Sequence, residues 1–309
     1  MSPNLPSVSI VIPARDAAGP LRHALDAVEA QTYPNIAEVI VAAADAVTAA
    51  AARGFRVVDN PAGTTPAGLN RAIEASTGEV IVRCDAQTSL PPRYVERAID
   101  TLLRTGADNV GGMQVPVGVS PWEKAIAEAM RSRLGAGDAR YRVGGEEGAV
   151  ETVYLGVFPR GVLQRLGGFD EDFVRNQDYE LNHRIIESGG TVWFDPELRV
   201  EYRPRGSLAA LARQYFEYGR AKRQFNHKHP GALRWRQWAA PALVAALAAG
   251  LVASIWFPPV LAVLVAYATG MVIAGATTDA SPLRVAAALA TMHLSWGVGF
   301  WSNRRGVSR

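Results

Sequence analysis

The sequence predicts an α/β fold with a mostly parallel sheet, followed by C-terminal transmembrane helices. The first run of the chain, "SVSIVI" at 7–12, is almost continuously apolar, as expected of a strand that is buried on both faces. Over residues 7–104 such strand-like runs alternate with helix-like stretches, and this alternation is typical of an α/β domain. Residues 239–278 then carry no charged side chain, which favours membrane helices near the end of the chain.

The elements of the α/β region are predicted one by one from their residue patterns. After the first strand, Gly19 and Pro20 open a helix that carries Leu21, Leu25 and Val28 on one face. Further strands are predicted at 38–42, 55–59 and 79–85, and helices near 66–76 and 92–104.

A ligand site is expected at one edge of this sheet, because ligands of open α/β sheets bind beyond the carboxyl ends of the strands. That edge is where "PARD" (13–16), Asn60 and Asp85 fall. The chain has no phosphate-binding glycine loop of either common type, which argues against a P-loop or dinucleotide-binding fold.

The bulk composition excludes several classes of protein. Hydrophobic residues make up 49% and charged residues 20%, so general disorder is excluded. The net charge of +3 is too small to indicate a nucleic-acid partner. Cys84 is the one cysteine, so no intrachain disulfide can form, which is compatible with a reducing compartment. The N-terminal segment lacks a basic region followed by a long apolar run and is not predicted to be a signal peptide.

Three uncharged stretches near the C-terminus approach the ~20 residues that cross a bilayer. They run over 239–257, 260–276 and 285–301, within helices predicted at approximately 239–257, 260–276 and 283–301, and the third is the weakest because His293 and Ser295 interrupt it. The sequence therefore predicts three regions: an α/β domain at 1–206, a basic amphipathic interfacial segment at 207–238, and a membrane domain of two to three helices at 239–309.

The segment before the first apolar stretch is basic. Between residues 213 and 238 it holds seven Lys and Arg residues against Glu217 alone, interleaved with tryptophans. Such a segment fits an anionic membrane surface better than nucleic acid. The positive-inside tendency then predicts a multi-pass protein of the cytoplasmic (inner) membrane whose N-terminal domain faces the cytoplasm.

Three crossings would conflict with the same tendency. They would place Arg304, Arg305 and Arg309 on the outer side. Three explanations stay open: the third stretch lies in the interface, the pair of stretches around Pro258 is re-entrant, or the tendency is overridden.

A polar cluster, "RNQDYELNHR" at 175–184, marks the start of a predicted helix. Asn176 can be its N-cap, accepting a hydrogen bond from a free backbone N–H. Asp178 falls in the first turn, where the helix dipole favours a negative charge. Leu181 and Ile185 can face a core, as can Ile186 from the adjacent row. A capped helix explains Asn176 and Asp178 but not the whole cluster.

Asp85 ends the fourth predicted strand, and Gln87 follows two residues later. The Asp85 carboxylate could simply cap the following turn. Alternatively it could be a ligand for Mg²⁺ or Mn²⁺ that holds phosphate oxygens, since these cations prefer oxygen donors.

Six stretches occur in an order that resembles the membrane-bound inverting glycosyltransferases of family 2, especially those of the succinoglycan type in exopolysaccharide synthesis. The resemblance covers roughly residues 7–225. The stretches are "SIVIPARD", "AGLNRAI" (67–73), "RCDAQ" (83–87), "GVFPRGVLQRLGGFDE" (156–171), "NQDYELNHR" and "RQYFEYGRAK" (213–222).

The resemblance implies a GT-A fold that binds a nucleotide-sugar donor, with an Mg²⁺ or Mn²⁺ ion on Asp85 and Gln87. It implies that Asp178 is the catalytic base, because an inverting transfer needs one carboxylate to take the proton of the acceptor hydroxyl. The remaining roles carried over are donor binding by Pro13, Ala14, Arg15, Asp16, Asp45, Asn70, Arg83 and Asp85, acceptor binding by Gly156, Asn176 and Gln177, and diphosphate or interface contacts by Gln214 and Arg220.

The sequence departs from the family pattern at three positions. Gln87 replaces an acidic or histidine ligand, and so adds an oxygen but no charge. Gln177 replaces the Glu before the catalytic Asp, and so adds no like charge beside Asp178. Ala43 stands where the family usually has the Asp that binds the base, which weakens the expected base recognition.

The predicted function is the transfer of a hexose from a nucleotide diphosphate sugar to a hydroxyl of a lipid-linked glycan at the membrane. Membrane lipids are expected partners, and nucleic acid is not. The alternative is a non-catalytic glycosyltransferase fold that acts as a scaffold in a glycan assembly complex. Against it, Asp85 and Asp178 both persist where the chemistry needs a carboxylate. A small transporter is a weaker third reading, because the apolar stretches carry no charge pairs for a transport path.

Overall fold

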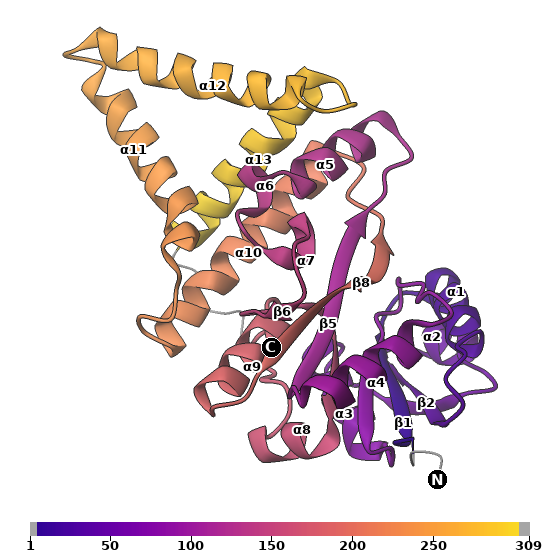
Figure 1. Cartoon of the computed structure of the whole chain (residues 1–309). Coiled ribbons are helices and arrows are strands. Elements are labelled where there is room, and N and C mark those ends of the chain that lie inside the picture. The colour runs from indigo at the N-terminus through magenta and orange to yellow at the C-terminus, as the bar shows by residue number, and fades with distance from the viewer. Residues whose placement is uncertain (1–4, 303–309) are drawn as a thin grey trace. The chain divides into compact units, whose positions relative to one another are not determined.

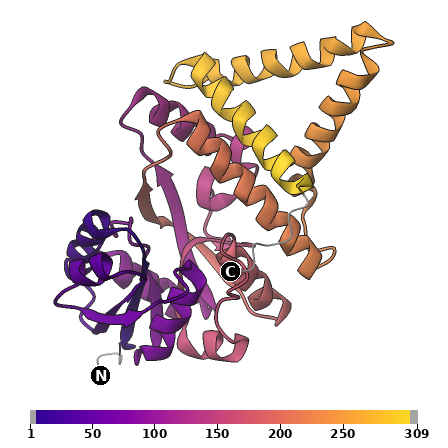
Figure 2. The ribbon, with the colours of Figure 1, turned by 180° about the vertical axis from the view of Figure 1, so that it is seen from behind.

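The computed structural model describes residues 5–302 of the chain and shows two compact units. Unit 1 takes its chain from residues up to 115 and from 139–202, and unit 2 from 116–138 and from 203 onward. The second unit thus takes in an internal segment, 116–138, that sequence patterns had assigned to the α/β domain. Figures 1 and 2 show the two units from opposite sides.

An eight-stranded mixed sheet forms the centre of unit 1, with strand order β3-β2-β1-β4-β7-β5-β8-β6. β1, β2, β3 and β4 pair in parallel, whereas β7 runs antiparallel to β4 and β5, and β6 antiparallel to β8. The strands are β1 Val8–Ala14, β2 Ile36–Ala43, β3 Arg56–Asp59, β4 Val80–Arg83, β5 Asn109–Pro116, β6 Gly148–Ala149, β7 Tyr154–Pro159 and β8 Val192–Tyr202.

The four strands predicted from the sequence are those of the parallel half, and the α/β class is confirmed. All seven residues of β1 are buried, as its uninterrupted apolar run predicts. The helices of unit 1 are α1 Ala18–Glu29, α2 Ala46–Ala51, α3 Thr65–Ala75, α4 Tyr94–Thr105, α7 Arg140–Val143, α8 Arg160–Leu166 and α9 Gln177–Glu187.

Amphipathic helices cover this sheet. The predicted face of α1 is confirmed, since Leu21, Leu25 and Val28 are buried in one core cluster with β1. α4 buries Val95, Ile99 and Leu102 in the same cluster and ends at Gly106, which adopts the left-handed conformation of a C-cap.

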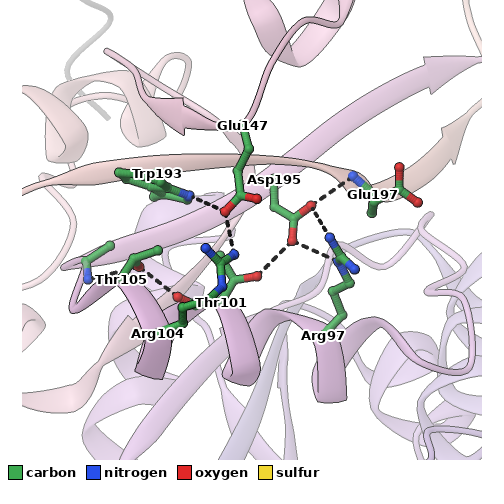
Figure 3. Close-up of polar contacts among 9 residues, drawn as sticks. Arg97, Thr101, Arg104, Thr105, Glu147, Trp193, Asp195 and Glu197 are labelled. Atoms are coloured by element: carbon green, nitrogen blue, oxygen red, sulfur yellow. Dashed lines mark hydrogen bonds and ion pairs between the residues drawn. The ribbon is translucent and has the colours of Figure 1, made fainter.

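A buried carboxylate fastens α4 to β8 (Figure 3). Asp195 accepts hydrogen bonds from Arg97 at 2.9 and 3.2 Å, from the Thr101 hydroxyl at 2.8 Å and from the Glu197 backbone N–H at 2.9 Å. Burial alone would raise the pKa of Asp195, but these hydrogen bonds outweigh burial and lower it. A buried carboxylate with all these donors is a structural element of the sheet.

Helices make up unit 2. α13 packs on α10 at close range, because Gly219 of α10 and Gly299 of α13 let the two backbones approach where any Cβ would clash. The elements are α5 Pro121–Arg131, α6 Arg133–Ala136, α10 Leu208–Lys228, the 3₁₀ turns η1 Trp235–Trp238 and η2 Pro258–Val260, α11 Ala239–Ala253, α12 Leu261–Ala276 and α13 Pro282–Trp301.

Among the described residues, two helical segments are long and apolar enough to cross a membrane, 235–253 and 258–276, and few residues of either are buried. The third predicted stretch differs. α13 buries Val285, Ala288, Leu289 and Met292, so it is a packed helix of unit 2 and not a third apolar span. Its polar His293 explains why: both ring nitrogens have protein partners.

Candidate active site

Three parallel strands of unit 1 end side by side at the predicted ligand edge. Ala14 of β1 pairs with Ala43 of β2, which in turn pairs with Asp59 of β3. The polar loop residues that follow these strands are therefore neighbours. The Asp16 backbone N–H, for example, donates to the Asp45 carboxylate at 3.0 Å.

Asp45 organises this edge. Its carboxylate also accepts from the Thr48 backbone N–H at 2.8 Å and from the Thr48 hydroxyl at 2.7 Å, so it caps α2. The hydrogen bond from Asp16 and the two from Thr48 lower the pKa of Asp45 to about 2. Asp45 therefore holds the 13–16 loop in place, whatever it contributes to donor binding.

The 13–16 loop presents its charges to solvent. Arg15 is exposed, forms an ion pair with Asp16 at 3.3 Å and donates to the Gly63 carbonyl at 3.5 Å. Pro13 and Ala14 are buried at the end of β1, and a Cβ on Gly68 would press on Pro13 and on Asn60. The first half of the loop, Pro13 and Ala14, is thus tightly packed, whereas the charged side chains of Arg15 and Asp16 are exposed.

Asp59 was missed by sequence reasoning. It is exposed and lies in register beside Ala43, the position that lacks the expected acid. The sequence signal is slight, a carboxylate at the end of a strand, and only the strand register places Asp59 beside that position.

A buried arginine, Arg83, contacts Asp85 at the end of β4. Arg83, the last residue of β4, donates from Nε to Asp85 Oδ1 at 2.9 Å and from Nη2 to Asp85 Oδ2 at 3.3 Å. The Arg83 side chain is 7% exposed, whereas that of Asp85 is 32% exposed. Gln87, two residues further on, is exposed. In this ion pair the arginine is therefore buried, whereas part of the carboxylate is exposed to solvent.

Asp178 interacts electrostatically with the same arginine. It lies half-buried in the first turn of α9, where its Oδ1 accepts from the Tyr179 backbone N–H at 2.8 Å. Burial alone would lower the pKa of Arg83, but Asp85 and then Asp178 interact with its charge and raise that pKa. Two carboxylates far apart in the sequence thus lie within electrostatic reach of one guanidinium.

α9 is firmly seated. Leu181 and Ile185 are fully buried, as predicted, whereas Ile186 is exposed. The wholly buried Glu180 pairs with Arg184 at 2.8 Å, and Arg184 also donates to the carbonyls of Leu166 and Gly168. These contacts fix the helix whose first turn carries Asp178.

Asn176 corrects one prediction. It occupies the N-cap position of α9, but its side chain makes no capping hydrogen bond, because its backbone is left-handed with φ of 61°. Among the described residues, three non-glycine residues have such a φ: Asp16, Leu155 and Asn176. Each adjoins a predicted site residue, and backbone strain of this kind gathers at functional sites.

Two of the predicted site residues have structural contacts that account for them. The Asn70 amide donates to the Phe169 carbonyl and accepts from the Phe169 N–H, both at 2.8 Å, and also contacts Glu171. Gly156 lies inside β7, where a Cβ would collide with the Phe158 ring. Direct donor contact by Asn70 and acceptor contact by Gly156 stay predictions.

Gln214 and Arg220 belong to unit 2. Both lie on α10, where Gln214 is buried and donates to the Tyr218 hydroxyl at 2.9 Å. Their predicted contact with the donor diphosphate stays a prediction.

The residues present fit a divalent cation. Each Asp85 oxygen receives one hydrogen bond from Arg83 and faces solvent, and the Gln87 amide follows on the exposed side. Carboxylate and amide oxygens suit Mg²⁺ or Mn²⁺. Because the described residues hold no group of three or more His, Cys, Asp or Glu, further ligands would come from a bound diphosphate and water.

The chain belongs to glycosyl transferase family 2, whose family model matches residues 9–167. That match includes the edge of the sheet with Asp45, Arg83 and Asp85. The resemblance found in the sequence is thereby confirmed.

Individual relatives agree with this assignment. The succinoglycan biosynthesis protein ExoA of Rhizobium meliloti is 34% identical over 253 residues, which cover 79% of this chain and 76% of the relative. The glycosyltransferase AglE of Haloferax volcanii is 25% identical over 238 residues, 72% of this chain and 75% of the relative.

A solved structure supports the fold. A mannosyltransferase from Pyrobaculum calidifontis, solved in complex with GDP-Man and Mn²⁺, superposes with a TM-score of 0.68 at 21% identity. The superposition covers 97% of this chain and 88% of the other. The α/β domain thus has the GT-A-like fold that the sequence predicted.

Proposed function

We propose that the protein is an inverting glycosyltransferase that moves a hexose from a nucleotide diphosphate sugar to a hydroxyl of a lipid-linked glycan. The observation that carries the proposal is that Asp85 pairs with the buried Arg83 guanidinium while Asp178 lies within electrostatic reach of the same group. A scaffold has no need to hold two half-exposed carboxylates against one buried cation. A transferase needs one carboxylate on the donor side and one on the acceptor side.

In this mechanism Asp178 accepts the proton of the acceptor hydroxyl while that oxygen attacks the sugar carbon from the face opposite the leaving group. Asp178 lies in the first turn of α9, and its neighbour Gln177 carries no charge. The hydrogen bonds of Arg184 keep α9, and hence Asp178, in position.

On the donor side, Asp85 and Gln87 would hold the Mg²⁺ or Mn²⁺ ion. When bound, this ion supplies positive charge against the diphosphate that leaves. Arg83 orients the Asp85 carboxylate through two hydrogen bonds. The 13–16 loop, Asp45 and Asp59 surround the place beyond the strand ends where the nucleotide would bind. The Mn²⁺ and GDP-Man of the Pyrobaculum calidifontis structure support a donor of this type.

Membrane attachment supports a lipid-linked acceptor. The two exposed apolar segments, 235–253 and 258–276, would hold the enzyme at the bilayer, with the α/β domain on the cytoplasmic side. The kinship with the succinoglycan biosynthesis protein supports exopolysaccharide or cell-envelope glycan synthesis as the setting.

The test is donor turnover by the purified full-length chain in detergent. Several nucleotide sugars are screened with Mn²⁺ or Mg²⁺ and a membrane lipid extract as acceptor. We expect nucleotide release with one donor, and a loss of about 100- to 10,000-fold in Asp178→Asn, the usual contribution of a general base. Asp100→Asn, on the exposed face of α4, is the matched control that keeps full activity.

The scaffold alternative rests on Ala43, Gln87 and Gln177, the three departures from the family pattern. It predicts silence with all donors and no nucleotide binding by calorimetry. Nucleotide binding without turnover in any acceptor extract would also count against the transfer proposed here, because an intact base and donor site would then have no reaction.

A further inference from the structure

The two exposed apolar helices of unit 2, α11 and α12, both adjoin α13, which packs against two charged helices. α13 forms the third side of a triangle with α11 and α12 (Figures 1 and 2). At its C-terminal end, Arg223 of α10 donates to the carbonyls of Phe300 and Trp301, both at 3.2 Å. Near its N-terminal end, the Arg284 guanidinium lies 5.7 Å from the centre of the Trp122 ring of α5.

Both partner helices are too polar for hydrocarbon. α10 holds Glu217 and several Lys and Arg residues, and α5 holds Glu123, Lys124, Glu128 and Arg131. Charged side chains in the centre of a bilayer are costly and rare. Glu123 of α5 also pairs with Arg203, shortly before α10, so the two polar helices are tied together. Because each end of α13 contacts one of them, both ends of α13 are expected on the same side of a membrane.

The two apolar helices begin and end at α13. The Trp301 indole N–H donates to the Pro241 carbonyl at 2.9 Å, which ties the start of α11 to the end of α13. Gly275, at the end of α12, lies so close to Pro282 that a Cβ would clash with its carbonyl. Arg236, just before α11, pairs with Asp138. The chain therefore begins α11 and ends α12 beside the same group of packed helices in unit 2.

The turn between the helices is built for a medium without water. From Ser254 to Leu261 every backbone N–H either donates within the turn or is absent because the residue is a proline. Ile255, Trp256 and Phe257 at this tip are exposed, and the chain carries no charged residue from 239 to 278. In hydrocarbon, backbone groups must be satisfied internally, whereas a turn in water has no such need.

The triangle also limits how deep the tip can reach. Each apolar segment has 19 residues, about 28 Å of helix at 1.5 Å per residue, and the 20-residue α13 separates their bases by about 30 Å. Two such sides on that base bring the tip roughly 24 Å from α13 at most. The hydrocarbon core alone is about 30 Å thick.

We propose that α11 and α12 form a re-entrant hairpin that enters the bilayer from the side of α10 and α13, ends with its apolar tip inside the hydrocarbon, and returns to the same side. The occupant of the exposed apolar surface is lipid hydrocarbon. The Lys and Arg residues of 213–238 and Trp235, which is 84% exposed, lie at its base and suit anionic headgroups. Residues 303–309 lie outside the described residues, but the helix that leads to them stays on the α10 side.

This inference rests on the membrane attachment in the proposed function, not on the chemistry. Its test is cysteine labelling of the full-length chain in sealed vesicles of both orientations with a membrane-impermeant maleimide. The wild-type chain supplies the background, because its one cysteine, Cys84, is buried. Single cysteines are introduced by Ala232→Cys and Asp279→Cys on the two flanks, and by Phe257→Cys at the tip.

We expect both flank cysteines to react in the same vesicle orientation. Phe257→Cys should stay at the wild-type background in both orientations and react only after denaturation. Phe257 is 61% exposed in the structure, so protein contacts cannot account for its protection. Ser254→Cys, a closely isosteric change in the same turn, repeats the measurement if Phe257→Cys folds poorly.

Three results would overturn the inference: reaction of the tip cysteine from the opposite face, flank cysteines that react in opposite orientations, or release of the wild-type chain from membranes by alkaline carbonate. Donor turnover is measured separately on the wild-type chain. A silent enzyme with the expected labelling pattern would therefore refute the proposed chemistry and leave the hairpin standing.

Discussion

Unit 1 contains two arginine–aspartate ion pairs with opposite patterns of solvent exposure: the carboxylate is the buried partner in one, and the arginine is the buried partner in the other. In the Arg97–Asp195 pair the carboxylate is fully buried and the arginine side chain is 44% exposed. In the Arg83–Asp85 pair the arginine side chain is 7% exposed and the carboxylate 32%. Both have the same shortest N–O distance, 2.9 Å.

The difference teaches how the same ion pair serves structure in one place and chemistry in another. The Asp195 oxygens accept hydrogen bonds from Arg97, Thr101 and a backbone N–H, and these bonds join α4 to β8 (Figure 3). Asp85 accepts two hydrogen bonds from Arg83, and its side chain is 32% exposed to solvent. A carboxylate that is hydrogen-bonded to a buried arginine but still partly exposed to solvent can bind a ligand.

Among changes to these two ion pairs, the largest effect is expected from Asp85→Asn. Losing the charge that holds the cation and diphosphate should lower donor turnover by about 100- to 1,000-fold, as for other single electrostatic groups in active sites. The melting temperature should fall less than in Asp195→Ala, because the amide oxygen can still accept a hydrogen bond from Arg83 and Asp178 still interacts with the Arg83 charge. Turnover and thermal melting are measured on the same preparation. A variant that keeps wild-type turnover would remove Asp85 from the site.

Asp195→Ala should produce the opposite pattern. It leaves Arg97 and the Thr101 hydroxyl without their shared acceptor, and breaking such a buried pair costs about 3 kcal/mol of unfolding free energy. Turnover per folded molecule should stay near that of the wild type. Chemical denaturation measures the first quantity and activity at low temperature the second. A stable but inactive variant would mean that this network also serves the chemistry.

The two arginines allow a matched and smaller test. Arg83→Lys keeps the charge but loses the two-point contact with Asp85, so we expect about a tenfold loss of turnover, the size of one charged hydrogen bond. Arg97→Lys is the control, and it should lower stability slightly and leave turnover unchanged. Mn²⁺ affinity, followed by electron paramagnetic resonance, separates a displaced Asp85 from a misfolded one. Equal loss of activity in both variants would contradict the contrast drawn between the pairs.

The smallest effect is expected in acid. Burial raises the pKa of Glu38, but hydrogen bonds from Thr77, Ser9 and Arg56 outweigh it and bring it to about 2, the value also reached by Asp45. Because both folded-state values lie below the unfolded values of about 4, this stability is complete above about pH 4.5 and is lost as the pH falls toward 2. Melting temperatures across this range measure it. Glu38→Gln should flatten part of the slope, and an unchanged slope would exclude Glu38 as a contributor.

Much of the fold followed from local patterns. The strands of the parallel half, the buried face of α1 and the buried Leu181 and Ile185 were all predictable, because burial on a strand or helix face imposes a period on the residues. The antiparallel half was not predicted, since strand pairing there joins segments through contacts that no local period records. The 116–138 segment likewise joins unit 2 through tertiary packing.

The candidate site divides in the same way. The sequence by itself determined that Asp85 ends a strand and that Asp178 opens a helix, because strand ends and helix starts are local features. Only the tertiary structure decided that both carboxylates interact with the charge of Arg83, that Asp59 lies beside Ala43, and that α13 packs on α10. Each of these depends on strand register or helix packing, where residues distant in the chain share one burial and one electrostatic environment.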